Sequence, residues 1–406
     1  MDKLRIYQII LIALFLRVAW SIFLGVEPVS DSNMYLQFAL TIMKEGSYAY
    51  PDGNLTAYWP VGTSALYASL FFLFGTSDIV IECFNLCVGL INVYLIYKVS
   101  TFYFNLKVAK IAAIIFAFWP LMIQMTTVIA SEMIFLTVCL LALFCWNHFR
   151  SKPVLQLITF GVVIGLGCYI RPTIILFLLI MPIIDSVTYS WKHSVKIFIP
   201  LLIVILITAP WAFRNTELFE YPTFISTNFG TNLWMGNNVN TTGAYMRLPD
   251  SIIGLNEKER ENELKQEAIE YITDDPARYF GLIIKRALLT FDRETIGVHW
   301  NLPQLKKLTS ESGINAIKII STAFWLIVLS LSVFGLIISL FKEKFNKIFF
   351  HPTALYFYFM SIPLLTVGQD RYHISMTVYI AMFAAYSISQ LIELLKRKNT
   401  NILKSI

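Results

Sequence analysis

Charged residues are scarce in this chain of 406 residues. They make up 14% of it, whereas hydrophobic residues make up 57%, and soluble domains carry about 25% charged residues. This scarcity excludes an ordinary soluble domain. The apolar residues form repeated runs of about 17 to 22 residues, the length that crosses a bilayer core. We therefore predict an all-α polytopic membrane protein with spans near residues 6–25, 78–98, 108–125, 130–149, 154–170, 172–187, 195–213, 315–341, 350–367 and 373–394.

Other absences narrow the class further. The five cysteines all fall inside apolar runs, so they form neither a disulfide framework nor a metal-ligand spacing. The chain contains no strand followed by a glycine-rich loop and a helix, the unit that binds a nucleotide. The net charge of +6 comes from basic residues at span ends, which indicates membrane topology and no nucleic-acid partner. The first apolar run is followed by no small-residue cleavage site, so we expect a retained span.

The basic residues predict the orientation of the spans. With about ten spans, most of the Lys and Arg residues of the short loops fall on one side, and that side faces the cytoplasm together with both termini. These residues are Lys3, Arg5, Lys98, Lys107, Lys110, Arg150, Lys152, Lys192, Lys196, Lys342, Lys344, Lys347, Lys396, Arg397 and Lys398. The opposite short loops carry few. The predicted location is the plasma (inner) membrane, and the apolar stretch 61–75 leaves an eleventh span open.

This topology divides the chain into three parts. Residues 1–213 form an N-terminal membrane module that includes a first outer loop, 26–77. Residues 214–313 form a second outer loop, and residues 314–406 form the C-terminal spans. The second loop is expected to hold a charged helix over 257–272 and an interfacial helix over 274–294, which begins with Asp275 and Pro276.

The first loop holds an isolated acid. Apolar residues at helical spacing predict a helix over 33–45, and Ser30 or Asp31 would cap it. On pattern alone, Asp31 fits an N-cap as well as it fits a catalyst. Tyr58 and Trp59 fit either an aromatic anchor at the membrane surface or a platform for a sugar or lipid headgroup.

Further ionisable residues are predicted at the same membrane boundary. Glu132, Arg171, Arg371 and His373 lie near the outer ends of spans, and Arg17 lies within the first span. A charge at membrane depth needs a partner or a wet cavity, so structural pairing, for instance of Glu132 with Arg17 or Arg171, is one interpretation. The other is transfer from a lipid phosphate, in which an acid accepts the acceptor's proton and cations neutralise the leaving phosphate.

The order of several short motifs resembles a known superfamily. The motifs are SD-x-x-x-Y at 30–35, G-x-Y at 46–48, TAYWPVG at 56–62, FLFG at 72–75, ASEMIF at 130–135, YIRPT at 169–173, TNLWMGNNVNTTGAY at 231–245 and RYHISMTVYIAM at 371–382. Together they resemble GT-C fold glycosyltransferases, especially the bacterial members of the protein O-mannosyltransferase and lipid A aminoarabinose transferase superfamily.

The resemblance implies a polyprenyl-phosphate sugar donor, an acceptor reached from the outer face and inversion at the anomeric carbon. It makes Asp31 the general base and Arg171, Arg371 and His373 contacts of the donor phosphate. It gives supporting roles to Tyr35, Tyr58, Trp59, Glu132, Asn237 and Asn238. Asn237 and Asn238 would line the cavity, although an Asn/Gly-rich turn explains them as well. The acceptor, whether lipid, glycan or protein, is not identified by the motifs.

One position departs from the family pattern. Many relatives carry a second acid directly after the catalytic one, whereas here Ser32 follows Asp31, which leaves a divalent metal open. Asp52 lies in a Pro-Asp-Gly turn, and turn chemistry explains it. Three other functions stay open: a transporter or lipid flippase, which predicts broken helices and polar groups at the midplane; a surface-polysaccharide ligase or polymerase; and a non-catalytic assembly subunit.

Overall fold

The protein is built from helices. The computed structural model describes residues 5–191, 196–252, 254–342 and 350–404, and its one β-bridge there joins Ala49 to Leu55. The α-helices are α1 Ile6–Leu24, α2 Asp31–Glu45, α3 Gly62–Phe74, α4 Asp78–Tyr103, α5 Leu106–Phe118, α6 Pro120–Gln124, α7 Ser131–His148, α8 Pro153–Cys168, α9 Phe177–Thr188, α10 Phe198–Phe219, α11 Phe229–Gly236, α12 Glu257–Asp274, α13 Pro276–Phe291, α14 Ile296–Trp300, α15 Leu302–Leu308, α16 Glu311–Lys342, α17 Phe350–Leu365 and α18 Thr377–Lys404.

Six helical segments of the described part are long and apolar enough to cross a bilayer. They are Ile6–Leu24, Asp78–Tyr103, Ser131–His148, Phe198–Phe219, Glu311–Phe341 and Asp370–Arg397, and a bent pair, Leu106–Phe118 with Pro120–Thr127, makes a seventh. The predicted spans near 154–170, 172–187 and 350–367 contain the shorter helices α8, α9 and α17. A multi-pass, all-α membrane protein is therefore confirmed, whereas the number of ten spans stays a prediction.

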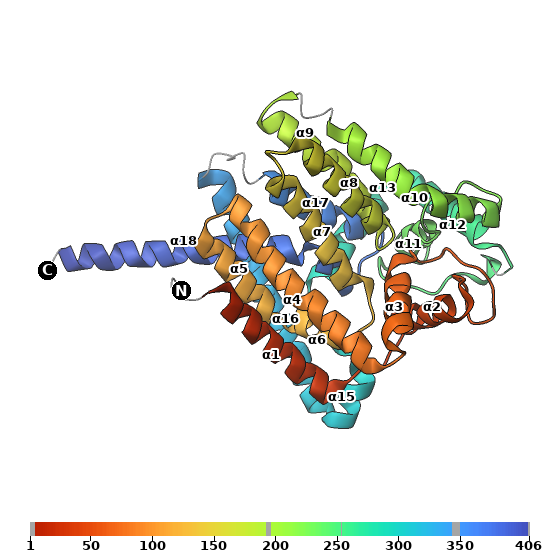
Figure 1. The fold of residues 1–406 in the computed structure, drawn as a ribbon, viewed down its shortest axis with the longest axis horizontal. Helices are drawn as coiled ribbons and strands as arrows, with labels where there is room; N and C mark the ends of the chain where they lie inside the picture. The colour runs from red at the N-terminus through yellow and green to blue at the C-terminus, as the bar shows by residue number, and fades with distance from the viewer. Residues whose placement is uncertain (1–4, 192–195, 253, 343–349, 405–406) are drawn as a thin grey trace.

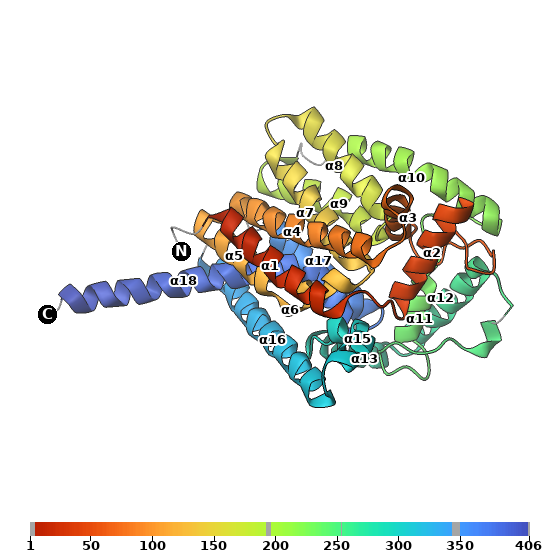
Figure 2. The same ribbon diagram turned by 60° about the horizontal axis from the view of Figure 1, so that its bottom comes forward.

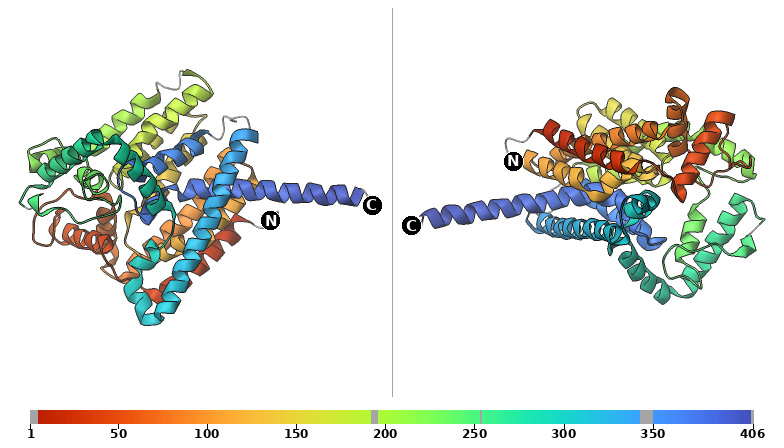
Figure 3. Two further views of the ribbon diagram at one scale, coloured as in Figure 1. Left: turned by 180° about the vertical axis from the view of Figure 1, so that it is seen from behind. Right: turned by 90° about the horizontal axis from the view of Figure 1, so that it is seen from below.

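The long helices form one bundle (Figure 1). Helices α1, α4 and α5 pack against one another, and α16 packs along α18. The first part of α18 and the short 3₁₀ turn before it run through the interior, where every residue from His373 to Tyr386 is buried. The second half of α18 projects from the bundle, on the same side as the start of α1. The loop helices α2, α3, α11 and α12 gather at the opposite end (Figures 1 and 2), and the view from behind shows the same separation (Figure 3).

A buried arginine completes the broken span. Pro120 has no N–H, so the carbonyl of Phe116 loses its helical donor and the helix bends by 57° between α5 and α6. Arg17 is fully buried and donates to the carbonyls of Ala117 at 3.2 Å and Phe116 at 3.5 Å. Because these bonds satisfy the break, the depth of Arg17 in the bundle has a structural explanation.

The predicted loop helices form, with small shifts of their ends. Helix α2 begins two residues before the predicted start, and its N-cap is Ser30, whose side chain makes no capping bond. Asp275 caps α13 as predicted, because its side chain accepts from the N–H of Arg278. Asn256 caps α12 through the N–H groups of Lys258 and Glu259.

Glu257 and Arg214 join the two loops. Glu257 accepts from the hydroxyl of Thr56 at 2.6 Å and the N–H of Ala57 at 2.9 Å. Arg214, near the end of α10, donates to the carbonyl of Thr56 at 2.7 Å. The stretch that leads to Tyr58 is thereby held between α10 and α12. Of the basic residues used to predict topology, Lys3, Lys192, Lys344 and Lys347 lie outside the described residues, as do the side chains of Lys342 and Lys398.

Candidate functional site

Asp31 opens helix α2 and forms an ion pair across the fold. Its Oδ2 accepts from Nη1 of Arg371 at 2.5 Å, although the two residues lie 340 positions apart. Ser30 takes the N-cap position with φ of +51°, a left-handed conformation that is strained for serine. That backbone places Asp31 one position inside the helix, where its carboxylate turns to Arg371. The side chains of Asp31 and Arg371 keep 27% and 21% of their surfaces exposed, so a ligand can reach the pair.

A second ion pair joins the start of α7 to the segment after α8. Arg171 pairs with Oε1 of Glu132, and its Nε donates to the hydroxyl of Ser131 at 3.0 Å. Glu132 is almost fully buried, whereas the side chain of Arg171 is 22% exposed. Of the two partners considered from the sequence, Glu132 therefore takes Arg171, and Arg17 lies elsewhere in the bundle.

Tyr35 brings the two pairs into one site. Burial raises the pKa of its phenol to about 12, the charges of Glu132 and Asp31 raise it as well, and Arg171 and a hydrogen bond with Ser131 oppose them. Because the charges of both carboxylates act on its phenol, Tyr35 lies near both ion pairs. The structure thus assembles Asp31, Tyr35, Glu132, Arg171 and Arg371, all five of which were candidates from the sequence.

Aromatic rings cover the site from the first loop. Tyr58 and Trp59 meet edge to face with centroids 4.6 Å apart, and Trp59 also contacts Tyr35 at 6.4 Å. Burial raises the pKa of Tyr58 to about 12, and Asp31 adds to the rise. The guanidinium of Arg260 on α12 lies 5.8 Å from the Tyr58 ring. Both aromatic candidates therefore border the Asp31 pair.

Ser32, the residue that departs from the family pattern, is buried. Its hydroxyl accepts from the backbone N–H of Ile129 at 3.2 Å, two residues before α7 begins. It therefore anchors α2 to the chain that carries Glu132. Asp52 is exposed and accepts from the N–H and the side-chain amide of Asn54, as expected of a turn acid.

His373 lies in a buried network beside the site. Its Nδ1 is 2.8 Å from the carbonyl of Thr290, its Nε2 is 3.1 Å from Oε1 of Glu294, and its ring stacks on Trp325 at 3.9 Å. The side chain is fully buried. Both ring nitrogens face protein oxygens, so the structure offers neither of them to a phosphate.

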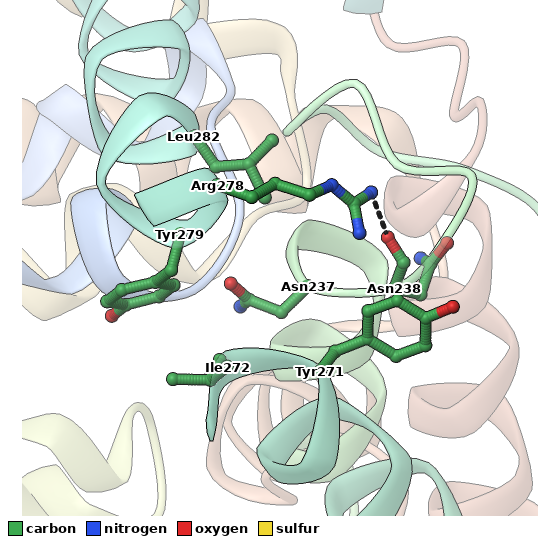
Figure 4. Close-up of a pocket in the computed structure, with 7 residues that line it drawn as sticks. All are labelled: Asn237, Asn238, Tyr271, Ile272, Arg278, Tyr279 and Leu282. Atoms are coloured by element: carbon green, nitrogen blue, oxygen red, sulfur yellow. Dashed lines mark hydrogen bonds between the residues drawn. The ribbon is translucent and has the colours of Figure 1, made fainter. Parts of the chain in front are cut away.

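Asn237 and Asn238, just after α11, face residues of α12 and α13 (Figure 4). Asn237 is buried and accepts from Arg286 at 2.5 Å, and the side-chain amide of Asn238 donates to the carbonyl of Trp234 at 2.8 Å. Both asparagines line a pocket of about 10 Å³ together with Arg278, whose guanidinium donates to the carbonyl of Asn238. A pocket of this volume holds about one water. The contacts favour the structural interpretation of these residues, and their role in a substrate cavity stays a prediction.

The described residues do not assemble a recognisable metal centre. Nowhere in the described ranges do three or more His, Cys, Asp or Glu side chains come together so that they could hold an ion. Asp31 and Glu132 each face an arginine instead.

Several residues of the site were missed from the sequence. Arg260, Glu257 and Glu294 all lie in the second loop, whose charges are too numerous for one to stand out.

One protein family matches a segment of the chain. Residues 59–213 match the sequence model of the family described as dolichyl-phosphate-mannose-protein mannosyltransferase. The match confirms, over these residues, the family resemblance expected from the sequence. The segment contains Glu132 and Arg171, whereas Asp31 and Arg371 lie outside it. No curated protein matches the chain significantly.

Solved structures share the fold. The archaeal oligosaccharyltransferase AglB from Archaeoglobus fulgidus, in complex with an inhibitory peptide and a dolichol-phosphate, has a TM-score of 0.56 at 16% identity over 100% of this chain and 52% of its own. The oligosaccharyltransferase of that organism tethered with an acceptor peptide gives 0.56 at 15%, over 96% and 50%. ArnT from Cupriavidus metallidurans bound to undecaprenyl phosphate gives 0.48 at 11%, over 94% and 78%.

The chain spans about half the length of the oligosaccharyltransferases that it matches. At such identity the likeness shows the fold alone. It confirms the GT-C type of fold that the sequence resemblance implied.

Proposed function

We propose that this chain is a membrane glycosyltransferase that takes its sugar from a polyprenyl-phosphate donor. The observation that carries the proposal is the pair of carboxylate–arginine contacts, Asp31 with Arg371 and Glu132 with Arg171, both of them near Tyr35. The matched mannosyltransferase family supports the enzyme class. A structural neighbour captured with a dolichol-phosphate supports the lipid-phosphate donor.

In the proposed reaction Asp31 is the general base. It accepts the proton of an acceptor hydroxyl, whose oxygen bonds to the anomeric carbon while the bond from that carbon to the phosphate oxygen breaks. The sugar inverts, and the polyprenyl phosphate leaves with the electron pair. Arg171 and Arg371 neutralise the leaving phosphate, for which charge-assisted hydrogen bonds from guanidinium groups are well suited.

The hydrogen bond between Arg371 and Asp31 explains how donor binding would free the general base. In the structure Arg371 donates to Asp31, so the arginine that should hold the phosphate occupies the carboxylate that should accept the proton. A phosphate that binds Arg371 would compete for these donors and release an oxygen of Asp31 to the acceptor. Glu132 would keep Arg171 in place, and Tyr35, Tyr58 and Trp59 would border the sugar. We do not carry His373 into this phosphate site.

The wider assignment is part of the same proposal. The chain would have ten spans in the plasma (inner) membrane, both termini in the cytoplasm and the Asp31 site at the outer face. Its three parts would be 1–213, 214–313 and 314–406. The start of α1 and the end of α18 lie on one side of the bundle and the loop helices at the other, which supports this orientation. The partners would be the lipid-linked donor, membrane lipids and a lipid, glycan or protein acceptor.

The transporter alternative predicts a broken helix, and the break between α5 and α6 is one. The donors of Arg17 already satisfy carbonyls at that break, however. The two ion pairs involve Asp31 at the start of α2 and Glu132 at the start of α7, away from the break. A ligase or polymerase of surface polysaccharide would use the same site chemistry with a different acceptor, so only the acceptor separates it from the main proposal.

The test follows sugar transfer in membranes. Membranes from cells that make the protein are supplied with polyprenyl-phosphate mannose labelled in the sugar, and labelled product is compared for the unmodified chain, Asp31→Asn and Asp52→Asn. Loss of a general base costs about 10²- to 10⁴-fold, so Asp31→Asn should lose at least about 100-fold. Asp52→Asn removes an equal charge from an exposed turn and should retain its rate. Undiminished transfer by Asp31→Asn would refute the assignment of the base.

A further inference from the structure

We propose that the buried pair of Glu294 and His373 positions the Arg371 guanidinium for its work on Asp31 and the donor. This inference rests on the proposed function. It assigns a role to a carboxylate that touches neither substrate nor Asp31, and it gives His373 a positioning role. Arg371 lies in a short 3₁₀ turn, Asp370–Met376, whose contacts determine the position of the arginine.

The turn is anchored on both sides of Arg371. On one side, Oδ2 of Asp370 accepts from the N–H of Thr295 at 3.0 Å and from its hydroxyl at 2.9 Å. On the other side, His373 contacts the Thr290 carbonyl and the Glu294 carboxylate. Both anchors therefore lie on the same six residues, 290–295, at the end of α13. Arg371, between them, has little backbone freedom.

The histidine contacts determine where protons lie. A carbonyl only accepts, so Nδ1 of His373 must carry a proton and donate to Thr290. Nε2 then faces Glu294 at 3.1 Å, and one further proton lies between the two groups, on either of them. In both cases a hydrogen bond joins the imidazole to the carboxyl group. The pair thus fixes the ring in one orientation.

Two tryptophans complete the enclosure of this pair. Nε1 of Trp119 donates to both oxygens of Glu294, at 2.9 and 3.0 Å, and Trp325 stacks on the His373 ring with only 12° between the planes. All four side chains are almost fully buried. Burial raises the pKa of the Glu294 carboxyl, whereas His373 and Trp119 lower it. A carboxyl group with this many partners has little freedom to move. Through its bond to His373 it restrains the 3₁₀ turn that carries Arg371.

The position of His373 affects the position of Arg371, because the two residues are close in the chain. Arg371 stands two positions before His373, and its Nη1 lies 2.5 Å from Asp31. A displacement of about 1 Å in a group that acts on the transition state can cost about 100-fold in rate. Without the Glu294–His373 bond, His373 would keep only its bond to the Thr290 carbonyl, and the turn would be held less firmly on that side of Arg371. The guanidinium would then sample positions from which it misses the phosphate.

The experiment removes the bond and then restores it. Glu294→Met keeps most of the volume and deletes the hydrogen bonds to His373 and Trp119. Glu294→Gln keeps both, because its amide can donate to Nε2 of His373 while its oxygen accepts from Trp119. Thr290→Val is the matched control, because it alters the same segment, keeps the carbonyl that His373 uses and removes a buried hydroxyl that has no partner among the described residues.

The measurement is transfer from labelled polyprenyl-phosphate mannose at saturating donor, together with the donor KM and the melting temperature. We expect Glu294→Met to lose about 10- to 100-fold in turnover, with a smaller change in KM. Glu294→Gln and Thr290→Val should stay within about threefold of the unmodified chain. In an Arg371→Met background, Glu294→Met should cost less than about twofold more, because the group it positions is gone.

Full turnover of Glu294→Met would overturn the inference, and so would an undiminished further loss in the Arg371→Met background, which would mark a general structural effect. If Glu294→Met does not fold, His373→Phe replaces it, because phenylalanine keeps the stack on Trp325 and loses the two hydrogen bonds. Absence of transfer by the unmodified chain from any polyprenyl-phosphate sugar supplied, mannose first, is a different outcome, since it would overturn the proposed function and this inference with it.

Discussion

Replacement of Gly62 by alanine should push the first loop away from the segment that carries Arg171. Gly62 begins α3, and its N–H donates to the carbonyl of Tyr169 at 2.7 Å. An added Cβ would lie 2.6 Å from that oxygen, 2.7 Å from its carbon and 2.8 Å from Cδ1 of Ile170. Two of these atoms are backbone and cannot rotate away, so the segments themselves must separate.

The size of the effect follows from these contacts. Ordinary contact begins at 3.4 Å, so the two segments must move apart by about 0.8 Å, and forced overpacking of this kind costs about 1–3 kcal/mol. Weakening of the hydrogen bond between Gly62 and Tyr169 adds about 1 kcal/mol. Tyr169 stands two residues before Arg171, so the same movement separates Arg171 from the first loop. Transfer should fall by about 10- to 100-fold.

The assay measures the melting temperature of the purified protein in detergent and the initial rate of labelled sugar transfer. Gly281→Ala is the control, because it lies inside α13 with open space around the new methyl group. Alanine stabilises a helix interior relative to glycine by about 1 kcal/mol, so this variant should melt no lower than the unmodified chain. A Gly62→Ala variant with unchanged melting and unchanged transfer would refute the reasoning.

Two further predictions concern the second loop. Arg286→Lys should lower the melting temperature, because a single ammonium cannot reproduce the guanidinium that donates to Leu364, Gly236 and Asn237. Lys285→Arg, at the exposed neighbouring position, should not lower it. Equal melting temperatures of the two variants would contradict this. Glu257→Gln should loosen the first loop, since the amide replaces one of the oxygens that accept from Thr56 and Ala57. Faster cleavage of residues 47–60 in limited proteolysis is the expected result, and unchanged cleavage would count against it.

The helices could be predicted where a local pattern determined them. The apolar run 6–25 became Ile6–Leu24, the charged segment 257–272 became Glu257–Asp274, and Asp275 caps α13 as its side chain suggested. Such features depend on residues within a turn or two of one another, so sequence periodicity contains them. The spans were harder to predict where a helix is interrupted at Pro120. Only the fold shows that Arg17 donates to the carbonyls of Phe116 and Ala117 there.

The site candidates divide in the same way. Asp31, Glu132, Arg171 and Arg371 could be selected from the sequence because charge is rare near membrane spans. Their pairing could not be selected, since Asp31 and Arg371 are 340 residues apart and Glu132 had both Arg17 and Arg171 as possible partners. His373 was predicted to contact the donor phosphate. The sequence does not show that its two ring nitrogens contact Thr290 and Glu294 instead.

The sequence by itself determined the class of protein and the acids and bases available to it. The length of a hydrophobic run is a local property that the bilayer imposes. Because charged residues are scarce, the few that lie near a span stand out in the sequence. The tertiary structure alone decided which charges meet. It places Asp31 against Arg371, Glu132 against Arg171 and Glu294 against His373. Each of these contacts depends on the packing of segments distant in sequence, because an ionisable group inside a bundle is stable only beside the partner that the fold supplies.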